Sequence, residues 1–320
     1  MFTRTVSKSA VSILGFLFVM SVLIGLSGSI ALADDGDWDQ CGNNEEFTTD
    51  FRLEDCRFKT RGVNPYFILK PGYRLELETP EEEGDRERSV ETVLHDTKWI
   101  HLDGRRIKTR VLEERAFEWE EGEGDEEGEW KMIEISLNYF AICHKTNAVY
   151  YFGEFSRDCE NGFTDDETMC EGEDGGPPTL PVTTGSWEAG VDTGEGVARP
   201  GIMMPGTPLL GAKYFQEIAP PDAVDRGEIV ELGLDWPEPD ELESAEAPDF
   251  TGCIKIFDTN PTPDGECGEE DAKIYCPGIG LVQDQELALV WAGFVDDDDD
   301  DGDDDDDDDD DDDGKWRRHR

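Results

Sequence analysis

Short stretches in which apolar and polar residues alternate recur along the chain, and this pattern restricts the fold more than any other feature. The clearest stretches are residues 73–78, 106–112, 131–137, 148–152, 212–218, 228–234, 253–257 and 286–291. Successive side chains of a β-strand point to opposite faces, so the alternation predicts a sheet with one dry face and one wet face. No apolar period of 3.6 residues extends beyond about three turns. The sequence therefore predicts about ten strands and no long helix.

Turn-forming pairs separate these stretches. They are Pro71-Gly72, Asp103-Gly104, Pro205-Gly206, Asp264-Gly265 and Pro277-Gly278. Gly and Pro supply the backbone angles of the tight turns that join antiparallel strands. The expected fold is all-β: an antiparallel curved sheet, either a half-barrel or a barrel- or sandwich-like arrangement.

The first 33 residues have the features of a secretory signal peptide. Basic Arg4 and Lys8 precede an apolar run of 16 residues that begins at Val11, and small residues at Ala31 and Ala33 form a cleavage site. The run is short for a membrane span. We expect cleavage after Ala33, a secreted or periplasmic mature protein, and no membrane span after cleavage.

Eight cysteines fit an exported protein, because disulfides persist in oxidising compartments. No Cys-x-x-Cys pair with zinc spacing occurs. Pairs that are close in sequence are favoured, namely Cys41–Cys56, Cys159–Cys170 and Cys253–Cys276. Cys143 and Cys267 then remain, either paired or free.

The formal net charge is −51, from 28 basic and 79 acidic residues. Residues 296–320 supply −13 of this charge, since 17 Asp stand against four basic residues. Negative charge repels phosphate backbones and anionic membrane surfaces, so nucleic acid is excluded as a partner. An acidic surface also suits a saline medium, in which salt screens the repulsion.

The aspartate run near the C-terminus is the candidate metal site. Repulsion and the poor helix propensity of Asp predict disorder, and carboxylate oxygens are ligands that Ca²⁺ prefers. Binding there is expected to be weak and spread over many sites. The candidate ligands are Asp296, Asp297, Asp298, Asp299, Asp300, Asp301, Asp303, Asp304, Asp305, Asp306, Asp307, Asp308, Asp309, Asp310, Asp311, Asp312 and Asp313.

No catalytic signature is present. The sequence lacks a nucleophile elbow, a zinc-binding helix, a phosphate loop and a dinucleotide-binding glycine pattern. His95 and His101, with Asp96 and Asp103 nearby, fit either a divalent-metal site or ordinary surface residues. We therefore expect a non-enzymatic protein with no catalytic residues, and with no cofactor apart from Ca²⁺.

Six segments carry a resemblance to a known family. They are residues 64–72, 92–98, 147–154, 185–192, 200–205 and 275–282, and they include the sequences Asn-Pro-Tyr-Phe, Gly-Ser-Trp-Glu-Ala-Gly and Pro-Gly-Ile-Met-Met-Pro. Together they resemble a family of uncharacterised exported bacterial proteins, which is distantly similar to half-barrel periplasmic lipoprotein carriers. The resemblance implies a curved antiparallel sheet from about residue 60 to residue 293, and it implies no catalytic residues.

Four regions follow from these observations. They are a signal peptide (1–33), an acidic lead-in (34–60), an antiparallel β domain (61–295) and a disordered poly-Asp tail with a basic end (296–320). We expect an exported binding or structural protein that holds a small amphipathic ligand in its curved sheet. The alternative is a protein that binds divalent cations with low affinity through the tail.

Overall fold

The computed structural model describes residues 46–80, 86–120, 122, 128–164, 166–172, 176–183, 185–221, 223–237, 250–260 and 272–295. The expected signal peptide, Cys41, Cys267 and the aspartate run lie outside these residues.

The described part of the chain is built from β-strands. The strands are β1 (Phe58–Lys59), β2 (Tyr73–Glu78), β3 (Glu87–Leu102), β4 (Arg105–Glu120), β5 (Glu129–Cys143), β6 (Val149–Asp158), β7 (Trp187–Glu188), β8 (Arg199–Met204), β9 (Lys213–Phe215), β10 (Glu217–Ile218), β11 (Arg226–Leu234), β12 (Cys253–Thr259), β13 (Ala272–Cys276), β14 (Gly280–Asp284) and β15 (Leu287–Phe294). Its helical element is a single 3₁₀ turn, η3 (Leu53–Asp55). The expectation of an all-β fold is confirmed.

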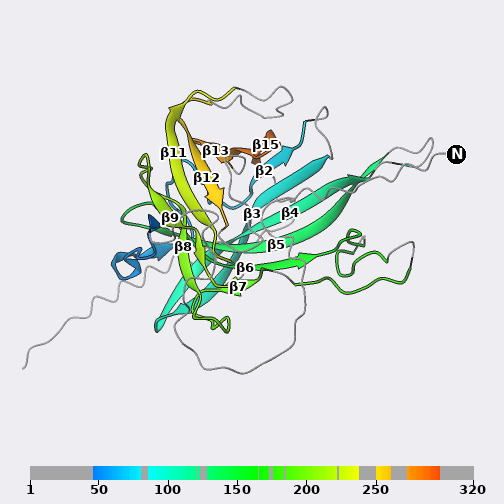
Figure 1. Ribbon diagram of the computed structural model, residues 1–320, viewed down its shortest axis with the longest axis horizontal. Helices are drawn as coiled ribbons and strands as arrows, with labels where there is room; N and C mark the ends of the chain where they lie inside the picture. Colours follow the sequence, from blue (N-terminus) through cyan, green and yellow to red (C-terminus); the bar gives the residue numbers. More distant parts are fainter. Residues whose placement is uncertain are drawn as a thin grey trace, which may run out of the picture.

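All the strands belong to one antiparallel sheet that curls into a nearly closed barrel (Figure 1). The strand order is β10-β8-β6-β5-β4-β3-β2-β15-β14-β13-β12-β11-β9, with β1 beside β5 and β7 beside β6. The two strands at the ends of this order, β9 and β10, are separated in sequence by Gln216 alone. We call residues 213–218 the seam, because the two edges of the sheet meet there without pairing with each other.

Close packing holds β8 against the seam. A Cβ atom on Gly201 of β8 would lie 2.3 Å from the carbonyl carbon of Gln216. No residue with a side chain fits at this separation. The backbone N–H of Gln216 is bonded to the carbonyl oxygen of Asp225 at 2.8 Å, which ties the seam to the start of β11.

The three longest strands bend because their pairing is interrupted by bulges. The register shifts between Val93 and Thr97 in β3, and between Ala116 and Phe117 in β4. A bulge adds residues to one strand of a pair, which bends the strand and increases its twist. Arg110 stabilises the first bulge from the neighbouring strand by donating a hydrogen bond to the carbonyl oxygen of His95 at 2.5 Å.

Residues 64–72 close one end of the barrel. The Asn64 amide donates to the carbonyl oxygens of Asn147 at 2.9 Å and Pro205 at 3.2 Å, while the Tyr66 hydroxyl donates to that of Gly252 at 3.1 Å. These partners come from three different loops. The segment that carries the first resemblance motif is therefore a cover that fastens the loops of this end together.

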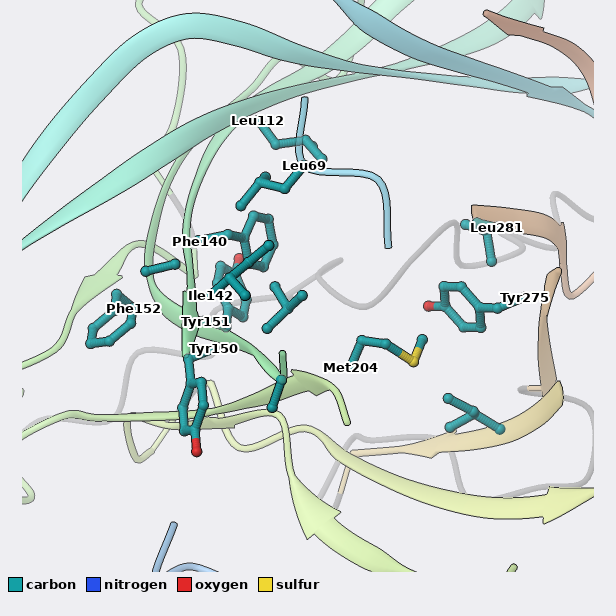
Figure 2. Packing of buried hydrophobic residues seen from close by; sticks show 14 of the residues in the cluster. Leu69, Leu112, Phe140, Ile142, Tyr150, Tyr151, Phe152, Met204, Tyr275 and Leu281 are labelled. Carbon is teal, nitrogen blue, oxygen red and sulfur yellow. The ribbon is translucent and has the colours of Figure 1, made fainter. Parts of the chain in front are cut away.

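The half of the interior next to this cover is apolar (Figure 2). Side chains from the cover and from five strands point toward one another there, namely Leu69, Leu112, Phe140, Ile142, Met204, Tyr275 and Leu281. All of them are buried. Burial of apolar surface is the main stabilising contribution to a core of this kind.

Two irregular segments cover parts of the outer face. Residues 46–60, which belong to the expected lead-in, place Phe51 and Phe58 edge-on against Tyr150, with ring centroids 6.3 Å and 5.2 Å away. On another part of the sheet, Phe163 and the Cys159–Cys170 disulfide pack with Met132 and Ile135 in a separate small core.

Two of the three expected disulfides are present, and one expected partner is wrong. Cys159–Cys170 and Cys253–Cys276 are bonded as expected. Cys56, however, is bonded to Cys143 and not to Cys41. The reason is that Phe58 of β1 lies opposite Cys143 of β5, which brings residues 87 positions apart to a Cα separation of 5.2 Å. Proximity in sequence does not detect a pairing made by the sheet.

Candidate functional site

Acidic side chains line the inner face of the barrel in the half that is remote from the cover. We call the following eight residues the acidic belt: Glu91, Glu114, Glu134, Glu154, Glu217, Asp225, Asp258 and Asp284. From Glu91 to Asp258, neighbours along this list influence one another electrostatically. Asp258 and Asp284 both pair with Lys273, and Asp284 in turn raises the pKa of Glu91. The belt therefore runs around the barrel interior.

Strand register explains why these residues share the inner face. Glu114 lies two positions after Leu112, whose side chain points inward (Figure 2). Side chains two apart on a strand point the same way. Glu114 also lies opposite Glu91 of β3 and opposite Ser136 of β5, so the same face continues across three strands.

Hydroxyl and amide groups bind several belt carboxyls. Ser89 Oγ donates to Glu114 Oε1 at 3.2 Å, and Ser156 Oγ donates to Glu134 Oε1 at 3.0 Å. The Tyr151 hydroxyl is bonded to Asn138 Oδ1 and also lies 3.1 Å from Glu154 Oε2. One hydroxyl proton satisfies one acceptor, so a proton on Glu154 completes the second bond.

One lysine neutralises the side of the belt formed by β12 and β14. Lys273 Nζ lies 3.1 Å from Asp258 Oδ2 and 3.5 Å from Asp284 Oδ2. Burial alone would lower the pKa of Lys273, but Asp284 and Asp258 raise it well above its ordinary value. Gln216 of the seam donates a further hydrogen bond to Asp258 Oδ1 at 3.0 Å. This part of the belt is thus internally compensated.

The remaining carboxyls hold protons more tightly than free side chains do. Burial, reinforced by the charge of Glu114, raises the pKa of both Glu91 and Glu134 to about 8. Burial also raises the pKa of Glu154 well above its ordinary value, with Glu134 as the next contribution. A carboxyl that is removed from water and surrounded by like charges favours its neutral form. The belt therefore stores protons at neutral pH.

Glu217 and Asp225 form a carboxyl pair beside the seam. Burial and the charge of Asp225 raise the pKa of Glu217 well above its ordinary value. Burial raises the pKa of Asp225 to about 6, although its hydrogen bond with Glu217 opposes the increase. Two buried carboxyls that influence each other in this way cannot both ionise at low cost.

Four buried polar atoms at or near this pair have no hydrogen-bond partner among the described residues. They are Glu217 Oε2, Asp225 Oδ1, the Tyr214 hydroxyl oxygen and Trp187 Nε1. Glu217, Tyr214 and Trp187 are only 2 %, 4 % and 6 % exposed, respectively. Buried polar atoms are nearly always hydrogen-bonded, so a group of four unsatisfied atoms requires an explanation.

Aromatic rings border the same carboxyls. Trp187 lies beside Glu217 and favours its ionised form, and Tyr151 reaches Glu154. The two rings meet edge to face with centroids 5.3 Å apart. Tyr151 also stacks on Phe140 of the apolar half at 4.7 Å. A continuous aromatic wall therefore joins the belt to the apolar half.

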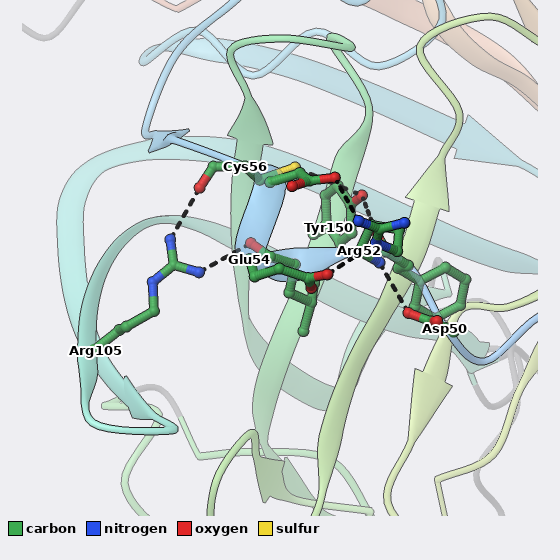
Figure 3. A network of polar contacts seen from close by, with 9 residues as sticks. Asp50, Arg52, Glu54, Cys56, Arg105 and Tyr150 are labelled. Carbon is green, nitrogen blue, oxygen red and sulfur yellow. Dashed lines mark hydrogen bonds and ion pairs between the residues drawn. The ribbon is translucent and has the colours of Figure 1, made fainter.

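A cavity of about 450 Å³ lies elsewhere, between the N-terminal segment, the turn joining β3 and β4, and β8. Around it Arg52 pairs with Glu54 at 2.8 Å, and Arg105 donates to the carbonyl oxygens of Leu53 and Cys56 at 2.9 Å each (Figure 3). These contacts fasten the segment onto the barrel, which gives this region a structural role.

The sequence contains two groups of possible metal ligands. The run Asp296–Asp301 and Asp303–Asp313 lies outside the described residues. His95, Asp96, His101 and Asp103 are exposed, and the bulge in β3 interrupts the continuous strand on which their shared face depends. Within the described ranges, no three His, Cys, Asp or Glu side chains converge in a way that could hold a metal ion.

Comparison with known proteins identifies no relative. No family model, no curated protein and no solved structure matches the chain. The resemblance to exported carrier-like proteins therefore stays a prediction. Among the described residues, no helix is long and apolar enough to cross a membrane.

Proposed function

We propose that this chain is an exported, non-enzymatic binding protein that holds an amphipathic ligand inside its barrel. One observation carries the proposal: the interior is apolar next to the cover and carboxyl-lined in the other half. A ligand with an apolar tail and a polar head matches both halves. The three disulfides and the signal-like N-terminus support a role outside the cytoplasm.

Part of the polar half keeps accessible surface although the sheet surrounds it, whereas Glu154, Glu217 and Asp284 are buried. Glu91, Glu114 and Glu134 are half-buried, in contrast to the fully buried Ile142 and Ile256 of the apolar half. Accessible polar surface inside a sheet is suited to water or to a polar group of a ligand. This distribution supports ligand binding over a purely structural role.

The test is a titration of the full chain with N-phenyl-1-naphthylamine, a neutral probe that fluoresces in apolar sites. We expect one probe molecule per chain. Leu281→Gln, in the buried apolar half, should weaken binding about tenfold or more, whereas Leu210→Gln, at an exposed leucine, should not. Circular dichroism checks that both variants fold. An absence of stoichiometric binding, or equal effects of the two variants, contradicts the proposal.

Low-affinity cation binding by the tail is the second candidate, supported by the density of 17 Asp in residues 296–313. Calorimetric titration of the full chain with Ca²⁺ tests it against a variant that has Ser at all 17 positions. Uptake should collapse in the variant, and unchanged uptake contradicts this candidate.

A further inference from the structure

We propose that the ligand head group bound at the seam is an organic ammonium ion, held by Glu217, Asp225 and Glu154 and bordered by Trp187, Tyr151 and Tyr214. This inference rests on the proposed function and specifies the chemistry of its ligand.

The charge of the belt is the first reason to expect a cation at the seam. The belt holds eight carboxyls and Lys273. This lysine pairs with Asp258 and Asp284 and also lowers the pKa of Asp225, while Arg226 interacts with Asp225 as well. No cation is among the groups that shift the pKa values of Glu154 and Glu217. Grouped carboxyls inside a protein are stabilised most effectively by a cation placed among them. The seam therefore favours a positively charged head group.

Unsatisfied buried atoms are the second reason to expect a ligand at the seam. Glu217 Oε2 and the Tyr214 hydroxyl are buried and have no hydrogen-bond partner among the described residues. Tyr214 of β9 lies opposite Gly227 of β11, which lies opposite Asp258 of β12, so Tyr214 and Asp258 share one face of the sheet. Glu217 is close enough to Asp225 and Glu154 for both carboxyls to raise its pKa. Both groups therefore point into the belt. An ammonium ion supplies what the unsatisfied carboxylate oxygen requires, either by an N–H bond or by direct charge pairing.

The aromatic rings around these carboxyls are the third reason, because they suit an organic ammonium ion. Trp187 and Tyr151 lie against Glu217 and Glu154, respectively. Organic ammonium ions are recognised by aromatic faces combined with carboxylates, because the ring quadrupole attracts a cation whose hydration shell is weak. The aromatic wall continues through Phe140 into the apolar half. The tail of the same ligand can thus lie along the wall.

Binding of an ammonium ion should release protons. The groups that face Glu217 are Asp225, Glu154 and Trp187, and those that face Glu154 are Glu134, Glu114, Tyr151 and Asp225. Burial raises the pKa values of both glutamates well above the ordinary value, and a nearby positive charge lowers them. Affinity should therefore rise with pH, since the ligand replaces protons in the belt.

The test uses octyltrimethylammonium, whose charge does not change with pH, below its micelle concentration. The full chain is titrated calorimetrically in 0.3 M NaCl, which screens the acidic surface. The uncharged counterpart is 1-octanol, and the anionic counterpart is octyl sulfate. We expect the ammonium compound to bind at least tenfold more tightly than either counterpart, and more tightly at pH 8.5 than at pH 6.

Two substitutions locate the site. Glu217→Gln and Glu154→Gln each keep the neutral side-chain shape, and each should weaken octyltrimethylammonium binding at least tenfold while 1-octanol binding changes less than twofold. Glu231→Gln, at an exposed glutamate of β11, is the matched control and should leave both affinities unchanged. Thermal unfolding verifies the fold, and two glutamates on different strands guard against the loss of one variant.

The outcomes separate the two proposals. Equal binding of all three octyl compounds, with no effect of the substitutions, overturns the ammonium inference and leaves the proposed function in place. Binding of none of them overturns both. Ammonium binding that Glu231→Gln weakens as much as Glu217→Gln also overturns the inference, because attraction to the acidic surface then explains it.

Discussion

Replacement of Glu134 by Gln should make the protein more stable at alkaline pH. The pKa of Glu134 is about 8 in the folded protein, against 4.5 for a free glutamate side chain. The folded state thus binds this proton more tightly than the unfolded state does. Stability from this group is fully present below pH 4.5 and is lost as the pH rises through 8.

The magnitude follows from these two pKa values. Each pH unit between them costs about 1.4 kcal/mol of unfolding free energy. The loss is then about 1 kcal/mol at pH 5 and about 4 kcal/mol at pH 8, a difference of about 3 kcal/mol. Gln at this position stays neutral, and its side-chain oxygen can still accept the hydrogen bond from Ser156 Oγ. Glu134→Gln should therefore not show this loss.

Urea unfolding followed by tryptophan fluorescence, at pH 5 and pH 8 without reductant, measures the effect. The advantage of Glu134→Gln over the unsubstituted protein should grow by about 3 kcal/mol between the two pH values. Glu231→Gln, at an exposed position, should follow the unsubstituted protein. If the unfolding free energies of Glu134→Gln and the unsubstituted protein change equally between pH 5 and pH 8, the pKa of Glu134 is not raised in the folded protein. That result would contradict the description of the belt as a group of protonated carboxyls.

Two further predictions concern the closure of the barrel and its covalent links. Gly201→Ala places a Cβ against the backbone of the seam and should lower the unfolding free energy by about 3 kcal/mol, measured by urea unfolding; a loss below 1 kcal/mol would show that the seam gives way freely. Replacement of the Cys56–Cys143 bridge by two alanines should cost about 4.6 kcal/mol, and replacement of the Cys159–Cys170 bridge about 2.8 kcal/mol, because the first closes 87 positions of chain and the second only 11. Equal losses in the two double variants would contradict this order.

Much of the fold could be predicted from local patterns. The stretch at 73–78 alternates strictly between buried and half-buried residues in β2, as expected. At Asp103-Gly104 both residues adopt positive φ angles, 50° and 75°, as a tight hairpin turn between two strands requires. Such features depend on neighbouring residues alone, so they can be read from the sequence.

The strands that border the belt were harder to predict. No alternating stretch marks β3, although it is among the longest strands, because its inward positions include the polar Ser89 and Glu91. The expected strand at 212–218 is divided at Gln216, where the two edges of the sheet separate. In both places polar residues face the interior. The alternation of apolar and polar residues, on which strand prediction depends, is therefore lost.

The belt itself was not identified from the sequence. Acidic residues are so numerous that the members of the belt cannot be distinguished from acids that are close in sequence by chance. The order of the strands in the sheet decides which acidic side chains lie together. Glu154 belongs to β6 and Glu217 to β10, and because both strands flank β8, Glu154 is near enough to raise the pKa of Glu217. A usable signal was the placement of acids among apolar strand residues, as in the run Met132-Ile-Glu-Ile135.

The most direct test of the account is the position of octyltrimethylammonium in the full chain, measured by nuclear Overhauser effects with selectively labelled protein. The account predicts contacts from the N-methyl protons to the Trp187 indole and from the terminal methyl of the chain to the Met204 methyl group, inside the apolar half. Contacts restricted to exposed side chains such as Leu209 and Leu210, with none to Trp187 or Met204, would contradict it.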